Sequence, residues 1–278
     1  MKKLRLDTLI LKRDLTESRS RAQALIMMGM VYVDGQKIDK CGTFVDEKAE
    51  IYIKEKLKYV SRGGLKLEKA RDFFHINFVD KVVLDIGSST GGFTDLALQS
   101  GAKRVHDVDV GKNLLHYSLM NSEKIVKHFG INFRYIDYNH INECVDIIVC
   151  DVSFISIKKL LGSMLQFCHK GTELVLLIKP QFEAERKDIC KNGIVKDIKV
   201  HRAVIYDIII ICSSYGFSFV GLTGSPVKGH KGNQEYLAYF IYNREVPNNL
   251  DHEVLENIIK GVIYENSCNN SETPCIEY

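Results

Sequence analysis

The chain has 278 residues, of which 45% are hydrophobic and 26% are charged, and its net charge is +3. This composition excludes a disordered chain and provides enough apolar residues for the core of one domain and of a smaller companion. Eight cysteines are scattered without a C-x-x-C pair or a repeated His/Cys spacing, so neither a zinc site nor a disulfide framework is indicated.

The amino-terminal sequence, MKKLRLDTLI, is charged and lacks both the apolar segment and the cleavage site of a signal peptide. The longest apolar runs, such as residues 208–212, are far shorter than the roughly 20 residues that cross a membrane. We therefore expect a soluble, cytoplasmic protein with reduced thiols and without membrane partners.

The first 60 residues have the pattern of a small separate domain, which we place at 1–60. Apolar residues recur at helical spacing over 4–15 and 18–28, and Ser18 is a suitable N-cap for the second helix. The period then changes to two, which predicts a hairpin over 31–38 and a further strand at 51–53. A lysine-rich linker at 54–60 separates this domain from the rest.

Positive charge is concentrated in the same part of the chain. Residues 1–71 contain 17 Lys and Arg against 10 Asp and Glu, a net charge of +7, whereas residues 72–278 contain 21 against 25, a net charge of −4. A basic region of this kind is typical of proteins that bind a polyanion, although an ordinary solvated surface has the same composition.

From residue 82 onward, apolar strands alternate with helical segments, which predicts a mainly parallel α/β sheet covered on both faces. The last two strands are separated only by a glycine-rich loop at 224–232, so we expect them to form an antiparallel pair at one edge. The main domain is placed at 61–245, and 246–278 is read as an optional tail with a helix at 253–263. The expected strands are 82–86, 105–110, 125–129, 147–151, 174–178, 217–222 and 237–242.

The sequence DIGSSTGGFTD, residues 85–95, lies between the first of these strands and an amphipathic helix. A glycine-rich turn at this place lets a ligand approach the backbone, as in nucleotide-binding sheets. The spacing matches neither G-x-G-x-x-G nor the P-loop, so a pyrophosphate clamp is disfavoured. An acidic strand end with such a loop suits S-adenosylmethionine; the alternative is an ordinary strand-to-helix turn.

Four charged residues occupy places that core packing does not explain. Asp151 and Lys179 end apolar strands at the sheet edge where open α/β proteins bind ligands, Lys66 begins a helix after SRGG, and Glu235 precedes the last strand. Taken singly, each is more often an ordinary surface charge. With S-adenosylmethionine as methyl donor, Lys179 could take the proton of a ribose 2′-hydroxyl or stabilise its alkoxide. Asp151 would hold Lys179, and Lys66 and Glu235 would form a second ion pair.

Taken in order, the motifs resemble the TlyA family of ribosomal RNA 2′-O-ribose methyltransferases, also called the hemolysin A family. The resemblance covers about residues 3–243. It implies an S-four-type RNA-binding domain followed by an FtsJ-type, Rossmann-like methyltransferase domain. The motifs that carry it are RLDTLI, SRSRAQALIMMGMVYVDG, SRGGLKLEKA, DIGSSTGGFTD, DVDVG, NFRY, CDVSFISI, LIKPQFE and GNQEYLAYF.

The resemblance implies that the enzyme methylates a cytidine in ribosomal RNA, with S-adenosylmethionine as cofactor, no metal, and a monomeric state when free. The implied catalytic tetrad is Lys66, Asp151, Lys179 and Glu235. The implied cofactor-binding residues are Asp85, Gly87, Ser89, Gly91, Gly92, Phe93, Asp109 and Asn132. The residues expected to contact RNA are Arg5, Lys12, Arg13, Arg19, Arg21 and Arg62. Phe129 departs from the family, which usually has an acidic residue at this position.

Three alternatives stay open at this point. The first is a methyltransferase for another RNA, because the tetrad does not name the nucleotide. The second is an RNA-binding or ribosome-assembly factor without catalysis, and the third, suggested only by the name hemolysin, is a cytolysin. The choice between the small and the large ribosomal subunit is also open.

Overall fold

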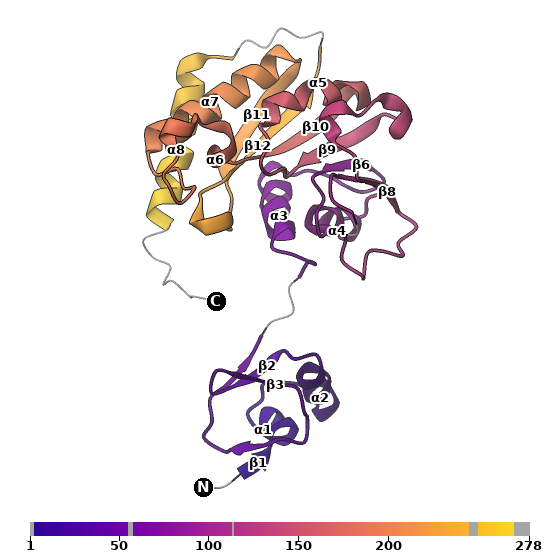
Figure 1. Ribbon diagram of the computed structural model, residues 1–278, viewed down its shortest axis with the longest axis vertical. Helices are drawn as coiled ribbons and strands as arrows, with labels where there is room; N and C mark the ends of the chain where they lie inside the picture. The colour runs from indigo at the N-terminus through magenta and orange to yellow at the C-terminus, as the bar shows by residue number, and fades with distance from the viewer. Residues whose placement is uncertain (1–2, 55–57, 113, 245–249, 270–278) are drawn as a thin grey trace. The chain divides into compact units, whose positions relative to one another are not determined.

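The computed structural model describes residues 3–54, 58–112, 114–244 and 250–269 (Figure 1). The chain forms two compact units, Met1–Lys58 (unit 1) and Tyr59–Tyr278 (unit 2). Their boundary lies within the linker expected at 54–60, of which residues 55–57 are outside the described residues. Tyr59 is buried in the core of unit 2.

Unit 1 packs two helices against short strands. Ser18 caps the second helix as predicted, because its Oγ accepts a hydrogen bond from the N–H of Arg21 at 3.2 Å. The predicted hairpin is present, and the strand at 51–53 pairs with its first strand. An additional antiparallel pair, β1 with β4, was not expected. The elements are β1 Lys3–Arg5, α1 Leu6–Lys12, α2 Arg19–Met27, β2 Val31–Val33, β3 Gln36–Ile38, β4 Phe44–Asp46 and β5 Ile51–Ile53.

Unit 2 is built on a seven-stranded sheet with the order β11-β12-β10-β9-β6-β7-β8. All neighbouring pairs are parallel except those of β12, which runs antiparallel to both β10 and β11. The expected antiparallel pair at one edge is therefore confirmed. The strands are β6 Val82–Ile86, β7 Arg104–Asp109, β8 Ile125–Phe129, β9 Val145–Cys150, β10 Cys168–Ile178, β11 Phe217–Gly224 and β12 Tyr236–Tyr242.

Helices cover both faces of this sheet because its central strands are apolar on both sides (Figure 1). On β6, Val83 packs with α3 Gly63–Phe74 and α4 Gly92–Gln99, whereas the next residue, Leu84, packs with the opposite layer. That layer consists mainly of α5 Leu161–Met164, α7 Ile198–Ser214 and α8 His252–Asn269. The expected three-layer α/β architecture is confirmed, and it leaves the carboxyl ends of the strands accessible.

The last helix belongs to the core and is not an optional tail. Leu255, Ile259 and Ile263 are buried in the same cluster as α7 and the sheet, and their four-residue spacing places them on one face of α8. The expectation of an optional tail was wrong for this helix, because the polar, asparagine-rich sequence around it hid the short apolar stripe that packs into the core. The polar segment 270–278 lies outside the described residues. Among the helices that the structure describes, none combines the length and the apolar character needed to cross a membrane.

Two histidines on β7 and β8 form a chain that ends at one carboxylate, because His128 contacts His106 and His106 contacts Glu143. The Nε2 atom of His106 on β7 lies 2.6 Å from Oε1 of Glu143. The Nδ1 atom of the same ring lies 3.0 Å from Nε2 of His128 on β8. Burial, followed by the neighbouring His106, lowers the pKa of His128 to about 4. Such a histidine is neutral in both states above its unfolded pKa and has no effect on stability there, but below that pKa the unfolded chain binds the proton more readily, so the folded state is destabilised.

We therefore expect the free energy of unfolding to fall as the pH decreases from about 6.5 toward about 4. In this range His128 binds a proton in the unfolded chain but stays neutral in the folded protein. Because the ring is only half-buried, the loss attributable to it should be on the order of 1 kcal/mol. Urea unfolding of the wild type and of His128→Gln, followed by circular dichroism at about pH 7.5 and about pH 5, measures this difference. An equal loss in both proteins would contradict it.

Candidate active site

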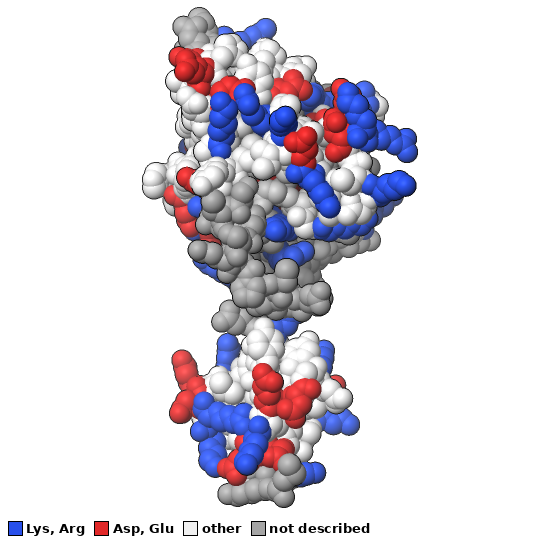
Figure 2. All heavy atoms as spheres, turned by 90° about the vertical axis from the view of Figure 1, so that its left-hand side faces the viewer, with Lys and Arg blue, Asp and Glu red and all other residues white. Residues whose placement is uncertain are grey.

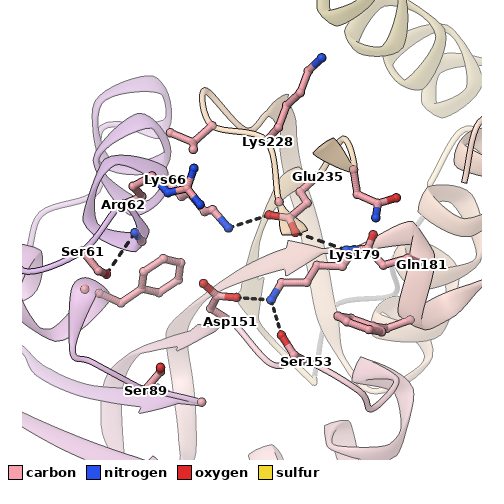
Figure 3. Close-up of a pocket in the computed structure, with 18 of the residues that line it drawn as sticks. Ser61, Arg62, Lys66, Ser89, Asp151, Ser153, Lys179, Gln181, Lys228 and Glu235 are labelled. Atoms are coloured by element: carbon pink, nitrogen blue, oxygen red, sulfur yellow. Dashed lines mark hydrogen bonds and ion pairs between the residues drawn. The ribbon is translucent and has the colours of Figure 1, made fainter. Parts of the chain in front are cut away.

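Three strand ends that lie side by side in the sheet build the site (Figure 3). The glycine-rich loop follows β6, Asp151 follows β9, and Lys179 follows β10. Parallel strands bring their carboxyl ends to one edge, and the N–H of Asp151 still bonds to the carbonyl of Ile86 at 3.0 Å. The sheet thus places the loop and the two charged side chains together.

Two Lys–carboxylate pairs face this edge. Lys179 Nζ lies 2.5 Å from Asp151 Oδ1, and Lys66 Nζ on α3 lies 2.6 Å from Glu235 Oε2 at the start of β12 (Figure 3). The side chains of Lys179 and Glu235 are only 8% and 2% exposed. A charge buried to this degree is tolerated because its partner lies at contact distance. The structure therefore brings together the four residues singled out from the sequence, as two separate pairs.

Neighbouring residues complete these pairs, and the sequence analysis did not identify them. Ser153 Oγ accepts a hydrogen bond from Lys179 Nζ at 3.0 Å, and the buried amide of Gln181 on α6 Pro180–Glu183 lies 3.5 Å from Glu235 Oε1. Phe154 is 91% exposed, has a positive φ of 64°, and its ring lies 5.1 Å from that of Phe182. In the sequence they stand two and three positions after Asp151 and Lys179, inside the motifs CDVSFISI and LIKPQFE.

Two adjoining cavities of about 640 Å³ and about 510 Å³ open at this edge. Both are lined by Gly87, Ser89, Asp151, Ser153 and Phe154, so they meet at the glycine-rich loop. The first also contains the two Lys–carboxylate pairs. Lys66, Lys179 and Glu235 line only the first cavity, whereas Asp151 lies at the junction of the two.

The expected cofactor-binding residues divide between these cavities. Asp85, Gly92 and Phe93 line the first, and Asp109 and Asn132 line the second. Gly91 lines neither, although its φ of +88° fixes the turn that begins α4. Asp109 already accepts hydrogen bonds from the N–H groups of Ser89 and Gly111, at 2.9 and 2.7 Å, and a carboxylate retains lone pairs for further donors.

The backbone of the glycine-rich loop approaches the strand end of β9 closely. Gly87 has a φ of +82°, and a Cβ at this position would lie 2.8 Å from the carbonyl oxygen of Asp151. Glycine removes both the strain of the left-handed conformation and this clash. The loop can therefore lie against Asp151 only with glycine at this position.

Replacing Gly87 with alanine should displace the loop and weaken binding of S-adenosylmethionine by about 10-fold or more, because forcing an extra carbon into a filled space costs about 1–3 kcal/mol. Isothermal titration calorimetry measures the affinity. Gly171→Ala is a matched control, because Gly171 also has a positive φ but a Cβ there would meet no atom within 4 Å. Unchanged affinity in Gly87→Ala would contradict the role given to the loop.

A buried carboxyl beside the first cavity has an unused acceptor. Asp85 is completely buried, its Oδ2 accepts a hydrogen bond from Thr94 Oγ1 at 2.7 Å, and its Oδ1 has no partner among the described residues. Burial, assisted by the neighbouring Asp107, raises the pKa of Asp85 well above its ordinary value. An unpartnered buried acceptor of this kind fits a cationic donor such as the amino group of S-adenosylmethionine.

The residues expected to contact RNA are placed differently from one another. Arg5 and Arg19 both bond to the buried carboxylate of Asp7, with the closest contacts at 3.0 and 3.1 Å. Arg13 donates to the carbonyls of Ala49, at 2.7 Å, and Glu47, and Lys12 pairs with the Glu47 carboxylate. On the surface of unit 1 visible in Figure 2, basic and acidic side chains lie next to one another.

The other two expected RNA contacts are Arg21 and Arg62, and both are exposed. Within the described part of the chain, the side chain of Arg21 has no hydrogen-bond or ion-pair partner. Arg62 lines the first cavity beside Lys66 and together with Lys228 (Figure 3). Lys231 lines the same cavity, and neither Lys228 nor Lys231 was selected from the sequence. No group of three or more His, Cys, Asp or Glu side chains in the described ranges is placed to hold a metal ion.

The sheet order, the glycine-rich loop and the strand-end charges define the chain as a methyltransferase of the Rossmann-like class. Residues 59–242 match the family model of FtsJ-like methyltransferases, and residues 4–51 match that of the S4 domain. With this pair of domains and the relatives described next, the chain belongs to the TlyA family of FtsJ-like methyltransferases.

The relatives match over most of their length. YqxC of Bacillus subtilis, provisionally named an rRNA methyltransferase, is 43% identical over 86% of this chain and 85% of its own. The 16S/23S rRNA (cytidine-2′-O)-methyltransferase TlyA of Mycobacterium tuberculosis is 32% identical over 86% of this chain and 90% of its own. A solved structure from Streptococcus thermophilus, provisionally named a hemolysin, is 38% identical with a TM-score of 0.73, covering 98% of this chain and all of that one.

Proposed function

We propose that this enzyme transfers the methyl group of S-adenosylmethionine to the 2′-hydroxyl of a cytidine in ribosomal RNA. The observation that carries the proposal is the pair of buried Lys–carboxylate contacts, Lys179–Asp151 and Lys66–Glu235, beside the glycine-rich loop in one cavity. The relatives named as rRNA (cytidine-2′-O)-methyltransferases support the choice of acceptor.

Lys179 is the residue placed to act on the acceptor oxygen. An ammonium group has three N–H donors; Asp151 and Ser153 take two of them, which leaves one for the ribose 2′-oxygen. S-adenosylmethionine supplies a methyl group already activated by the sulfonium. Lys179 would stabilise the alkoxide character that develops as the oxygen–carbon bond forms and the sulfur–carbon bond breaks. The hydroxyl proton would pass to water in the open cavity, and the electron pair of the broken bond would stay on the sulfur of the leaving thioether.

The second pair would orient the acceptor. Glu235 uses Oε2 for Lys66, and its Oε1 and the Gln181 amide lie at the same cavity wall. Two polar groups fixed by burial can hold a ribose in line with the methyl group, and such positioning supplies a large share of catalysis in a methyl transfer. Lys66 also balances the charge of Glu235 in this buried position.

The cofactor would extend across both cavities. Its amino acid end would meet Asp85, the loop at Gly87, Ser89, Gly91 and Gly92, and Phe93, while Asp109 would accept from the ribose hydroxyls and Asn132 would lie near the adenine. Unit 1, the S4 domain, would bind structured RNA, with Arg21 its expected contact best placed to reach a phosphate, and Arg62 in unit 2 would reach a phosphate from the first cavity. We expect the enzyme to be a monomer when free of RNA.

The test is transfer of radiolabelled methyl from S-adenosylmethionine to separated small and large ribosomal subunits, purified from cells that lack this protein. Label incorporated into the RNA of one or both subunits supports the proposal and identifies the subunit. If the protein binds S-adenosylmethionine but labels neither subunit, then either its substrate is a different RNA or its role is limited to binding RNA. Leakage of membranes by the purified protein would instead favour a cytolysin.

A further inference from the structure

Five positively charged side chains line the first cavity, and three of them have no counter-charge. Lys66 and Lys179 are held by Glu235 and Asp151, at 2.6 and 2.5 Å. The other three are exposed and have no hydrogen-bond or ion-pair partner among the residues that the structure describes. They are Arg62, Lys228 and Lys231. The mouth of this cavity therefore carries unpaired positive charge.

The composition of this part of the chain does not explain that charge. Residues 72–278 contain 21 Lys and Arg against 25 Asp and Glu. The acidic side chains that line the first cavity are nevertheless used elsewhere: Asp85 is completely buried, and Asp151 and Glu235 are in ion pairs. S-adenosylmethionine has a sulfonium and an amino group against one carboxylate, so a bound cofactor adds positive charge. The anion that neutralises the three free cations must be a different ligand.

The loop between β11 and β12 holds two of these cations in a fixed place. The N–H of Ser225 bonds to the carbonyl of Glu235 at 2.9 Å, which closes the loop. Gly229 lies directly against the Glu235 carboxylate, because a Cβ at this position would collide with Oε1. Lys228 and Lys231 stand on either side of Gly229 in the chain. Both lysines therefore extend from backbone that is anchored at the Lys–carboxylate pairs.

The third free cation comes from a different element. Arg62 directly precedes α3, and Lys66 on α3 contacts Glu235 at the end of the loop (Figure 3). The cations thus lie on both sides of this contact, with Arg62 on the side of α3 and Lys228 on the side of the loop. A nucleotide within an RNA strand has a phosphate on each side of its ribose. This arrangement fits a phosphodiester chain that crosses the mouth of the cavity.

We propose that Lys228 and Lys231 form an RNA-backbone site in unit 2, which binds phosphate on one side of the acceptor nucleotide. The inference rests on the proposed function, because it takes RNA as the polyanion. Lysine ammonium groups neutralise phosphates without reading a base. The site would therefore determine where the strand lies at the cavity, and it would leave the choice of nucleotide to other contacts.

Replacing both lysines in the full chain, Lys228→Gln with Lys231→Gln, tests the site. Single-turnover methyl transfer is measured against the concentration of the ribosomal subunit that the wild type labels, which separates binding from chemistry. We expect the half-saturating concentration to rise about 5–30-fold, with the saturated rate within about threefold of the wild type. The slope of log affinity against log potassium chloride, at constant magnesium, should become shallower by about 1.4–1.8.

Lys103→Gln with Lys124→Gln is the matched control. Both lysines are exposed, and they directly precede the parallel strands β7 and β8, at the edge of the sheet opposite to the site. This control removes the same charge from unit 2, so the half-saturating concentration should stay within about twofold of the wild type. Lys228→Arg with Lys231→Arg keeps both charges and should also bind as the wild type does.

The outcomes separate this inference from the proposed function. An unchanged half-saturating concentration and salt slope in the Lys→Gln double variant would overturn the inference. An equal change in the control would also overturn it, because net charge alone would then account for the effect. A loss of affinity for S-adenosylmethionine, measured by titration calorimetry, would instead assign the lysines to the cofactor's carboxylate. In these three cases methyl transfer by the wild type still supports the proposed function, whereas a wild type that labels no ribosomal RNA would overturn both.

Discussion

Replacing Lys179 with methionine should reduce methyl transfer by about 1,000-fold while leaving the affinity for S-adenosylmethionine within about threefold of the wild type. Methionine has a similar length and fills the same space, but it cannot place a positive charge at the acceptor oxygen. The effect is expected in the rate of transfer at saturating cofactor, because Lys179 acts on the acceptor oxygen. The change also leaves Asp151 without its partner at 2.5 Å.

Single-turnover methyl transfer measures that rate, and titration calorimetry measures cofactor binding separately. Lys187→Met is a suitable control, because Lys187 also pairs with a carboxylate, that of Glu185 at 2.7 Å, but both side chains are 74% exposed. A Lys179→Met enzyme with a rate near that of the control would remove Lys179 from the chemistry. The proposed role of the Lys179–Asp151 pair would then have to be abandoned.

Replacing Asp7 with alanine should unfold unit 1 in a large fraction of molecules and leave unit 2 folded. Asp7 is completely buried, and its carboxylate joins Arg5 and Arg19 to Gln23, whose Nε2 lies 2.8 Å from Oδ2. The hydrogen bond from Arg5 is the main reason that the pKa of this carboxyl lies well below its ordinary value. Loss of these charge-assisted bonds should cost about 2–4 kcal/mol.

That cost matters because unit 1 is small. A unit of this size has a total stability of only a few kcal/mol, about 0.05–0.15 kcal/mol per residue. Hydrogen exchange followed by mass spectrometry should show fast exchange throughout unit 1 in Asp7→Ala, with unit 2 unchanged. Asp39→Ala, at an exposed position of the same unit, should preserve protection. Protection of unit 1 in Asp7→Ala comparable to the wild type would refute this account of its stability.

The sequence was most informative where side-chain periodicity and strand ends coincide. Alternation of apolar strands and helices predicted the sheet of unit 2, and the polar residues Asp151 and Lys179 directly after apolar strands pointed to the edge where the cavities lie. The ion pairs at this edge join segments that are far apart in the chain, as the pair Lys66 and Glu235 shows. Strand-end position predicts that such groups are near one another, but their distances depend on packing.

Other features had no signal of this kind. The strand β1, Lys3–Arg5, overlaps the segment 4–15 whose apolar spacing indicated a helix, and β4, Phe44–Asp46, buries only its middle residue. Asp107 does not stand out in the sequence, because four of the six residues of β7 are polar or charged, and only the register of β6 with β7 shows that it lies beside Asp85. Basic composition predicted a polyanion-binding unit, yet it could not show that Arg5 and Arg19 contact Asp7 within their own unit. Such pairings depend on tertiary structure.

The central claim is that the acceptor is a ribose 2′-oxygen of cytidine, and the position of the transferred methyl group tests it most directly. Ribosomal RNA methylated by the purified enzyme with labelled S-adenosylmethionine would be digested to nucleosides and separated by chromatography with mass detection. We predict that the label elutes as 2′-O-methylcytidine and is absent when Lys179→Met replaces the wild type. Label on a methylated base, or in RNA treated with the Lys179→Met enzyme to the same extent, would contradict the account.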